Sequence, residues 1–135
     1  MKKIFISYRF MGEDPKELKK IIPQIHEAIK EAGHEYYSTI FDSEQFINEK
    51  WSGKQIMKKA FRKIDNSDLI LFFVRSSEIS QGMLVELGYS LAKKKKIMLA
   101  IQKSIYDSIF RRHIDKVIEF EDLKDLKQKL SRLNI

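Results

Sequence analysis

The feature that most restricts the fold of this chain is a run of six apolar residues, Leu69–Val74. A strand without polar residues is typical of a parallel sheet that helices cover on both faces. A second apolar segment, Gly82–Ala92, follows within a few residues and carries one charged residue, Glu86. Together the two segments predict a buried strand, a short polar turn and a buried helix.

Hydrophobic spacing in the rest of the chain predicts further strands and helices in alternation. Pro23 lies inside the first predicted helix and is expected to kink or split it. The segment Asp42–Ser52 has no clear period and is expected to be a loop, while Ser104–Arg112 is ambiguous between a loop and a short helix. The other predicted strands are Ile4–Ile6, Glu35–Phe41, Ile97–Ile101 and Val117–Phe120, and the other predicted helices are Asp14–Ala32, Ser52–Ile64 and Asp122–Leu133.

This alternation predicts one domain over residues 1–135. The predicted fold class is α/β, a flavodoxin-like, doubly wound parallel five-stranded sheet in the order 2-1-3-4-5 with helices on both faces. Such sheets bind ligands outside the strand carboxyl ends, at the switch point between strands one and three. The residues expected to meet there are Ser7, Tyr8 and Arg9 after the first strand, Arg75 after the third, and Ser80 at the start of the next helix.

Composition excludes several kinds of site. The chain has no cysteine, which rules out disulfides, thiolate metal sites and cysteine nucleophiles. Its three histidines show no metal-ligand spacing, so neither a metal nor another cofactor is predicted.

Charge and hydropathy also limit the expected partners. The net charge of +7 includes the run Lys93–Lys96. Because the sequence shows no pattern of a nucleic-acid-binding module, this charge indicates a solvated surface rather than a nucleic-acid partner. The amino terminus lacks the long apolar run of a signal peptide, and no apolar stretch is long enough to span a membrane. A cytoplasmic protein without a membrane partner is therefore expected.

Glu86 is the residue most expected to carry chemistry, because a carboxylate is costly to bury in an apolar helix unless a partner or ligand compensates it. Its position about one turn after the expected N-cap, Ser80, places it near helix amides and a dipole that tolerate anions. Glu86 could accept hydrogen bonds from sugar hydroxyls, or stabilise or attack an oxocarbenium-like centre. The structural alternative is that Glu86 only accepts a hydrogen bond from a neighbouring loop.

The arginines near the predicted switch point favour an anionic group in the ligand. Arg9 and Arg75 could hold a phosphate through charge-assisted hydrogen bonds. Ser80 and the backbone near Gly82 could add donors, because a glycine lets a ligand approach the backbone. The alternative for either arginine alone is a strand cap or a surface ion pair, and Tyr8 can equally be a half-buried aromatic residue. The predicted substrate-binding set is Ser7, Tyr8, Arg9, Arg75, Ser80 and Gly82, with Glu86 as the catalytic residue.

The segment from Ser80 to Ala92 resembles the nucleoside 2-deoxyribosyltransferase family, and it is similar to the related deoxynucleoside 5′-monophosphate N-hydrolases. The likeness lies in Ser80-x-Gly82-x-x-x-Glu86-Leu87-Gly88-Tyr89-Ser90-Leu91, followed by a basic link and a strand. It implies cleavage or transfer of the N-glycosidic bond of a (deoxy)nucleoside or nucleoside 5′-monophosphate. In these relatives the glutamate matching Glu86 acts at the sugar, and in the hydrolases the residues matching Ser80 and Gly82 help to bind the 5′-phosphate. Relatives often dimerise, which implies a homodimer.

One departure from that family concerns the acid that assists the leaving base. Relatives usually carry an aspartate in the helix before the third strand, where this chain has Ala60. Four acidic residues are candidates to replace it: Asp42, Glu44, Asp65 and Asp68. If none of them does, the resemblance implies a nucleotide-binding module that has lost its activity.

A second resemblance involves the first strand. The opening of Toll/interleukin-receptor (TIR) domains resembles the segment Phe5-Ile6-Ser7-Tyr8-Arg9. TIR domains also place a serine six residues before a glutamate that leucine follows, as Ser80, Glu86 and Leu87 stand here. This resemblance implies an alternative function, a TIR-like domain that cleaves NAD or acts in signalling. The continuation Gly88-Tyr89-Ser90-Leu91 is more similar to the deoxyribosyltransferases.

Overall fold

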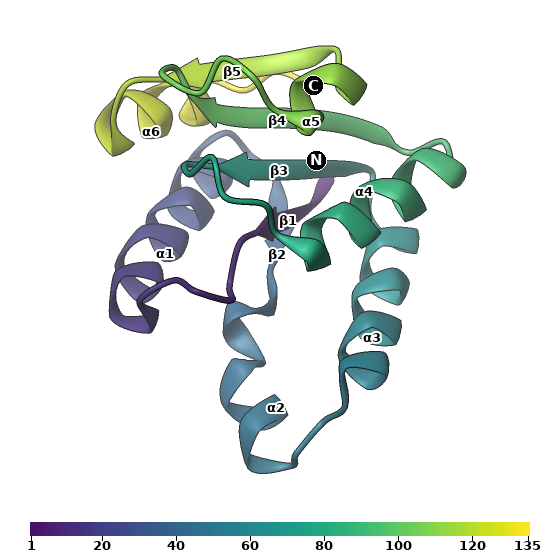
Figure 1. Ribbon diagram of the computed structural model, residues 1–135. Helices are drawn as coiled ribbons and strands as arrows, with labels where there is room; N and C mark the ends of the chain where they lie inside the picture. The colour runs from purple at the N-terminus through teal and green to yellow at the C-terminus, as the bar shows by residue number, and fades with distance from the viewer.

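The central strand is the apolar run itself, β3 (Leu69–Val74), which pairs with parallel neighbours on both sides. The computed structural model describes residues 1–135. Its sheet has five strands in the order β2-β1-β3-β4-β5, all parallel (Figure 1). The predicted fold class and strand order are therefore confirmed. The other strands are β1 (Lys3–Tyr8), β2 (Glu35–Tyr37), β4 (Lys96–Gln102) and β5 (Lys116–Phe120).

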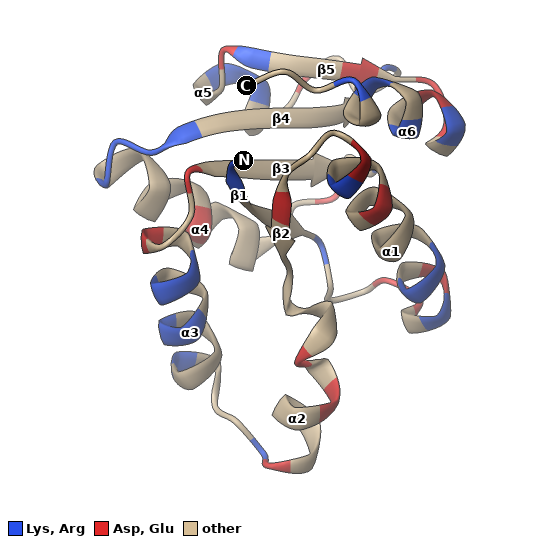
Figure 2. Cartoon of the chain, turned by 180° about the vertical axis from the view of Figure 1, so that it is seen from behind, with Lys and Arg blue, Asp and Glu red and all other residues tan.

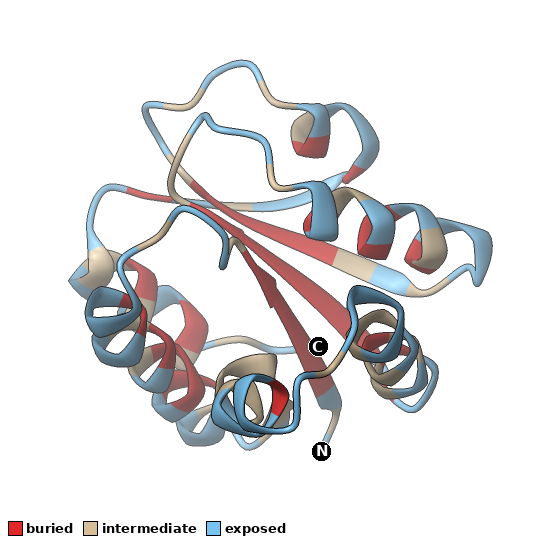
Figure 3. Cartoon of the chain, turned by 60° about the horizontal axis from the view of Figure 1, so that its bottom comes forward, coloured by how far each residue is buried: buried red, intermediate tan, exposed pale blue.

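Helices cover both faces of this sheet. The helices are α1 (Pro15–Glu31), α2 (Ser43–Asn48), α3 (Gly53–Asp65), α4 (Gln81–Ala92), α5 (Ile109–His113) and α6 (Leu123–Ser131). Helices α1 and α6 pack on one face, and α3, α4 and α5 pack on the other. Alternate residues of β3 enter the two cores, so that Phe73 packs with α1 and α6 while Phe72 packs with α3, α4 and α5. Figure 3 shows the buried strands between helices whose outer sides are exposed.

Local sequence signals explain where the main helices begin. Asp14 accepts a hydrogen bond from the Lys16 amide and precedes Pro15, which suits the first position of α1. Ser52 and Gln55 form a reciprocal capping box at α3. The Ser80 hydroxyl accepts a 3.3 Å hydrogen bond from the Met83 amide, which confirms Ser80 as the N-cap of α4.

Four local predictions need correction or completion. Pro23 does not split α1, because it lies on the exposed side while the opposite side of the helix is buried against the sheet. The strand predicted to reach Phe41 ends at Tyr37 and is followed by a short 3₁₀ helix, η1 (Thr39–Phe41). The predicted loop contains α2, because Phe46 is buried and packs with its ring centroid 4.8 Å from that of Trp51. The ambiguous segment ends in the short helix α5.

Basic residues are concentrated on α3, where Figure 2 shows repeated bands of Lys and Arg. Two of these lysines turn toward the end of β2 and the segment that follows it. Lys59 Nζ lies 3.0 Å from Asp42 Oδ2, and Lys63 Nζ lies 4.7 Å from the centroid of the Tyr37 ring. Part of the positive charge therefore serves contacts between α3 and the extension formed by η1 and α2. None of the helices combines the length and apolar character that crossing a membrane requires.

Candidate active site

Ser7 and Glu86 form the centre of the candidate site. Ser7 is the fifth residue of β1 and lies beside Phe72 of β3, while Glu86 lies in the second turn of α4. The Ser7 hydroxyl donates a 2.7 Å hydrogen bond to Glu86 Oε1, and both residues are buried. The predicted switch point thus brings a residue of β1 and a residue of α4 into direct contact.

The second oxygen of Glu86 remains accessible. Glu86 Oε2 takes part in no hydrogen bond, and no fully buried side-chain oxygen or nitrogen of the protein lacks a partner. Oε2 must therefore keep some access to the surface, although only 9% of the residue is exposed. One carboxylate oxygen is thus held by Ser7, and the other has no hydrogen-bond partner and keeps slight exposure.

Burial gives Glu86 unusual proton affinity. Burial raises the pKa of Glu86 from 4.5 to about 7, and the hydrogen bond from Ser7 lowers that pKa in part. At neutral pH the side chain is thus divided between the carboxylate and the carboxylic acid. A carboxyl group balanced in this way can act as a nucleophile or exchange a proton with a ligand.

Two tyrosines lie close to Glu86. Burial raises the pKa of Tyr8, a hydrogen bond from Thr39 lowers it in part, and the charge of Glu86 raises it further. Burial also raises the pKa of Tyr37, with contributions from Asp42, Tyr8 and Glu86. Both phenols therefore remain protonated at neutral pH. The Tyr37 hydroxyl donates a short hydrogen bond to Asp42, whose carboxylate also pairs with Lys59.

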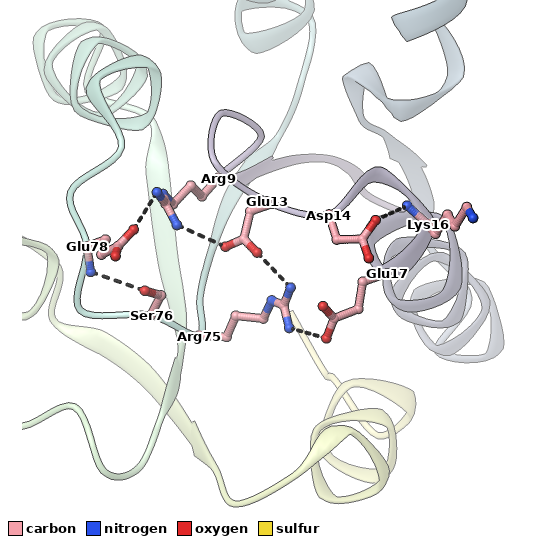
Figure 4. Close-up of polar contacts among 8 residues, drawn as sticks. All are labelled: Arg9, Glu13, Asp14, Lys16, Glu17, Arg75, Ser76 and Glu78. Atoms are coloured by element: carbon pink, nitrogen blue, oxygen red, sulfur yellow. Dashed lines mark hydrogen bonds and ion pairs between the residues drawn. The ribbon is translucent and has the colours of Figure 1, made fainter.

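Arg9 and Arg75 are joined by a carboxylate rather than left free (Figure 4). Glu13, which is 12% exposed, lies between them, with Oε1 3.3 Å from Arg9 Nη1 and Oε2 2.8 Å from Arg75 Nη2. Glu78 Oε2 lies 2.6 Å from Arg9 Nη2, and Glu17 Oε1 lies 3.0 Å from Arg75 Nη1. We call these five residues the arginine cluster. Both arginines therefore form ion pairs with carboxylates, which was the structural alternative to a phosphate contact.

Gly12 allows Arg9 to reach this position. Its backbone has φ +82°, a conformation that favours glycine, and a Cβ atom there would lie 2.5 Å from Arg9 Nη2. A side chain at this position would push the guanidinium away from its partners. The turn after β1 is thus shaped around the arginine cluster.

A pocket connects the arginine cluster to the start of α4. Tyr8, which lies close to Glu86, and Ser80 are both among the residues that line this pocket, whereas Gly82 and Glu86 are not. Gly82 is exposed at the first turn of α4. The lining residues are Tyr8, Arg9, Glu13, Leu18, Phe73, Val74, Arg75, Ser76, Glu78, Ser80, Met83 and Phe110.

The family model of nucleoside 2-deoxyribosyltransferases matches residues 8–122, which include every part of this site except Ser7. The chain belongs to this family. The match confirms the predicted family and, with it, the predicted class of chemistry at the N-glycosidic bond of a nucleoside or nucleotide. The resemblance to TIR domains and the roles of individual site residues stay predictions.

Solved structures of similar fold extend the comparison of this nucleoside 2-deoxyribosyltransferase family member. A CMP N-glycosidase from Clostridium botulinum is 23% identical, with a TM-score of 0.70 over 96% of this chain and 97% of that protein. A 2-deoxyribosyltransferase from Bacillus psychrosaccharolyticus is 21% identical, with a TM-score of 0.67 over 95% of each chain. A conserved protein from Enterococcus faecalis is 15% identical, with a TM-score of 0.60 over 96% of this chain and 99% of the other. No curated protein sequence matches the chain.

The structure separates the four acidic residues that could replace the aspartate missing at Ala60. Asp68 binds the Lys3 amide at the amino-terminal edge of the sheet, opposite the site. Asp65, at the end of α3, accepts hydrogen bonds from Tyr89, and Glu44 is a surface residue of α2. Asp42 alone contacts a residue that lies near Glu86, namely Tyr37.

Sequence reasoning missed Glu13, Tyr37 and Lys59 as parts of this region. Tyr37 is the last residue of β2, next to β1, so its place at the carboxyl edge was available from the strand order. Glu13 precedes the N-cap of α1 and carried no motif. Its position between two arginines depends on the turn at Gly12, which sequence spacing does not predict.

Proposed function

We propose that this chain cleaves or transfers the N-glycosidic bond of a nucleoside or nucleotide, with Glu86 acting at the sugar. The observation that supports this assignment is the arrangement of Glu86 in a member of this family. One carboxylate oxygen is held by Ser7, the other has no hydrogen-bond partner and is not fully buried, and burial raises the pKa of the group to about 7.

In the proposed reaction, Glu86 Oε2 attacks the anomeric carbon while the bond to the base nitrogen breaks. The base leaves with the bonding electron pair and takes up a proton, and the sugar is held as an ester of Glu86. Water then releases the sugar, or a second base accepts it. Burial favours the attack, because a carboxylate with little hydration loses little solvation when the positive charge of the oxocarbenium-like centre develops beside it.

The remaining predicted residues have supporting roles in this proposal. Ser7 holds the attacking carboxylate through the 2.7 Å hydrogen bond, so its part is to position Glu86 rather than to bind sugar in the open pocket. Tyr8, Arg9, Arg75 and Ser80 line the pocket and contact the sugar and its 5′ group. Gly82 leaves the first turn of α4 open to the ligand.

Release of the base tests this proposal directly. The purified protein is incubated with ribonucleosides, deoxynucleosides, their 5′-monophosphates and NAD, and released bases are separated by liquid chromatography. A second base in the reaction distinguishes transfer from hydrolysis. Release that Glu86→Gln abolishes without unfolding the protein supports the proposal, and nicotinamide release from NAD alone supports the TIR-like alternative. Ligand-induced thermal stabilisation without turnover supports the inactive binding module.

A homodimer and a cytoplasmic location also remain proposals. Val85 and Leu91 of α4 are 48% and 44% exposed, which leaves apolar surface on this helix for a second copy. Light scattering coupled to size-exclusion chromatography measures the mass in solution. A monomer mass at all concentrations contradicts the homodimer.

A further inference from the structure

A groove between α3 and α4 brings aromatic rings together outside the candidate active site (Figure 1). Phe61 of α3 and Tyr89 of α4 line it with stacked rings, at a centroid separation of 4.0 Å and an interplanar angle of 9°. Trp51, just before the N-cap of α3, lines the same groove. All three residues are half-buried, so each ring keeps part of its surface accessible. The groove shares no lining residue with the pocket at the arginine cluster.

The cations of α3 divide between two sides of the helix. Lys59 and Lys63 contact the end of β2 and the segment that follows it. Lys54, Lys58 and Arg62 are exposed and take part in no ion pair. Because they recur at every fourth position, they lie on one side of the helix, with a rise of about 6 Å between neighbours. These three residues form a line of positive charge, and Lys58 and Arg62 border the groove.

The groove has a positive balance of charge. Asp65 is the one carboxylate that lines it, and the Tyr89 hydroxyl donates hydrogen bonds of 2.8 Å to both of its oxygens. Lys93 adds a cation on the α4 side, with Nζ 5.5 Å from the centroid of the Tyr89 ring. Lys93 and the three cations of the line thus outnumber a single carboxylate that already has a partner. An anionic ligand suits this surface, whereas a symmetric contact with a second copy would bring like charges together.

Single-stranded nucleic acid combines both chemical features that the groove can recognise. Its phosphates repeat along a line, as the cations of α3 do, whereas an isolated phosphate is best held by donors that converge on one point. Its unpaired bases stack on aromatic side chains. A duplex keeps its bases stacked on each other, and an acidic peptide would satisfy the cations but offers no repeating flat group to the rings. A single strand therefore fits this groove better than either.

We propose that the groove between α3 and α4 binds a single strand of nucleic acid, with phosphates along Lys54, Lys58 and Arg62 and bases against the aromatic rings. The inference does not depend on the proposed function, because the groove is separate from the candidate active site. The sequence by itself indicated a solvated surface, because these rings and cations come from separate segments that meet only in the fold.

Fluorescence anisotropy of a labelled single-stranded oligonucleotide measures this binding at low salt. The double variant Lys58→Gln with Arg62→Gln is expected to raise Kd by about tenfold or more. It should also lower the slope of log K against log salt by about 1.4, since each phosphate contact on a single strand contributes about 0.7. The matched control is Lys20→Gln with Lys124→Gln, which removes the same charge from exposed positions on α1 and α6, at the opposite face of the sheet. The control should bind the strand as the wild type does.

Trp51 is the single tryptophan of the chain and reports contact with the bases. Stacking of a base on its ring should quench its fluorescence as the strand binds. A duplex of the same sequence and polyglutamate of equal charge should both bind more weakly than the strand. The inference is overturned by equal affinity of the two double variants, by equal or tighter binding of the duplex or of polyglutamate, by unchanged Trp51 fluorescence, or by no binding at low salt.

Discussion

The Ser7 hydroxyl donates a 2.7 Å hydrogen bond to the Glu86 carboxylate, although the two residues are 79 positions apart in the sequence. The parallel sheet makes this contact by placing the carboxyl end of β1 beside β3, from which the chain returns as α4. The contact stabilises the charged form of Glu86 against the cost of its burial. The ionisation of Glu86 is therefore the property on which the first two predictions depend.

Activity is expected to rise with pH through a midpoint near 7, because only the carboxylate form of Glu86 attacks the sugar and burial raises its pKa to about 7. Ser7→Ala removes a hydrogen bond that lowers this pKa, so the midpoint should shift to higher pH. The measurement is kcat/KM for base release between pH 5 and 9 in both proteins.

Ser90→Ala is the matched control for Ser7→Ala. Ser90 is also a buried serine, but its hydroxyl donates a 2.7 Å hydrogen bond to the backbone carbonyl of Glu86 rather than to its carboxylate. Its removal should leave the midpoint where it is in the wild-type protein. Equal midpoints in Ser7→Ala and Ser90→Ala would show that the Ser7 contact does not tune Glu86.

The stability of the protein should change with pH in the opposite direction to its activity. Glu86 keeps its proton in the folded state up to about pH 7 but loses it near 4.5 when unfolded, so folding becomes less favourable as pH rises through this window. Glu86→Gln is therefore expected to stabilise the protein at pH 8 by roughly 1–3 kcal/mol and to change it little at pH 4.5. Urea denaturation at the two pH values measures this difference. A variant that is less stable than the wild type at pH 8 contradicts the ionisation argument.

The alternation of apolar strands and helices was sufficient to predict the sheet order and the meeting of Ser7, Arg75 and Ser80 at one edge. These features depend on hydrophobic periodicity and on the handedness of parallel crossovers, which are local or general. The environment of Arg9 was not predictable, because it depends on a glycine turn and on Glu13, a residue without a motif. Hydrophobic periodicity does not indicate which ion-pair partner a single charged residue will contact.

The same distinction explains the segment after β2. Phe41 was expected to continue the strand, but its ring stacks on His26 with centroids 4.9 Å apart, which turns the chain into η1. Phe46 and Trp51 stabilise α2 by packing against each other in a stretch that has too few turns for a helical period to be visible. Tertiary contacts, rather than local propensity, determine this region.

His26 should make the protein sensitive to mild acid. It is buried, stacks on Tyr36 with ring centroids 4.3 Å apart and shares a 2.9 Å hydrogen bond with Ser38. Burial lowers its pKa to about 4 from its usual 6.5, so the unfolded state takes up the proton first as pH falls through this window. The contribution of His26 to stability should therefore decrease from pH 6.5 to pH 4, by an amount of the order of 1–3 kcal/mol.

Two glutamine variants isolate the contribution of His26 from that of Glu86, which acts with the opposite sign over part of the same range. His26→Gln can keep the hydrogen bond to Ser38 but cannot take up a proton, so its change in stability from pH 6.5 to pH 4 should be more favourable than that of the wild type. His113→Gln, at an exposed position, is the matched control and should follow the wild type. Parallel curves for the wild type and His26→Gln would mean that His26 does not contribute to acid sensitivity.

Asp42 is the acidic residue expected to replace the aspartate missing at Ala60. It accepts a hydrogen bond from Tyr37, and the phenol of Tyr37 remains protonated in a region that also senses the charge of Glu86. The Tyr37 hydroxyl, which donates to Asp42, is the donor of this pair, and it would have to turn from Asp42 to serve a leaving base. Loss of a proton donor commonly costs about 10²–10⁴-fold in rate. Asp42→Asn and Tyr37→Phe should each lower kcat for base release by at least about tenfold with a smaller effect on KM. Asp65→Asn is the matched control, because Asp65 also accepts a hydrogen bond from a tyrosine, Tyr89, but lies at the carboxyl end of α3, away from Lys59 and Tyr37 in sequence. If Asp42→Asn releases base as fast as Asp65→Asn, the leaving base is protonated by water or by another group, and Asp42 serves only to hold α3 against the segment after β2.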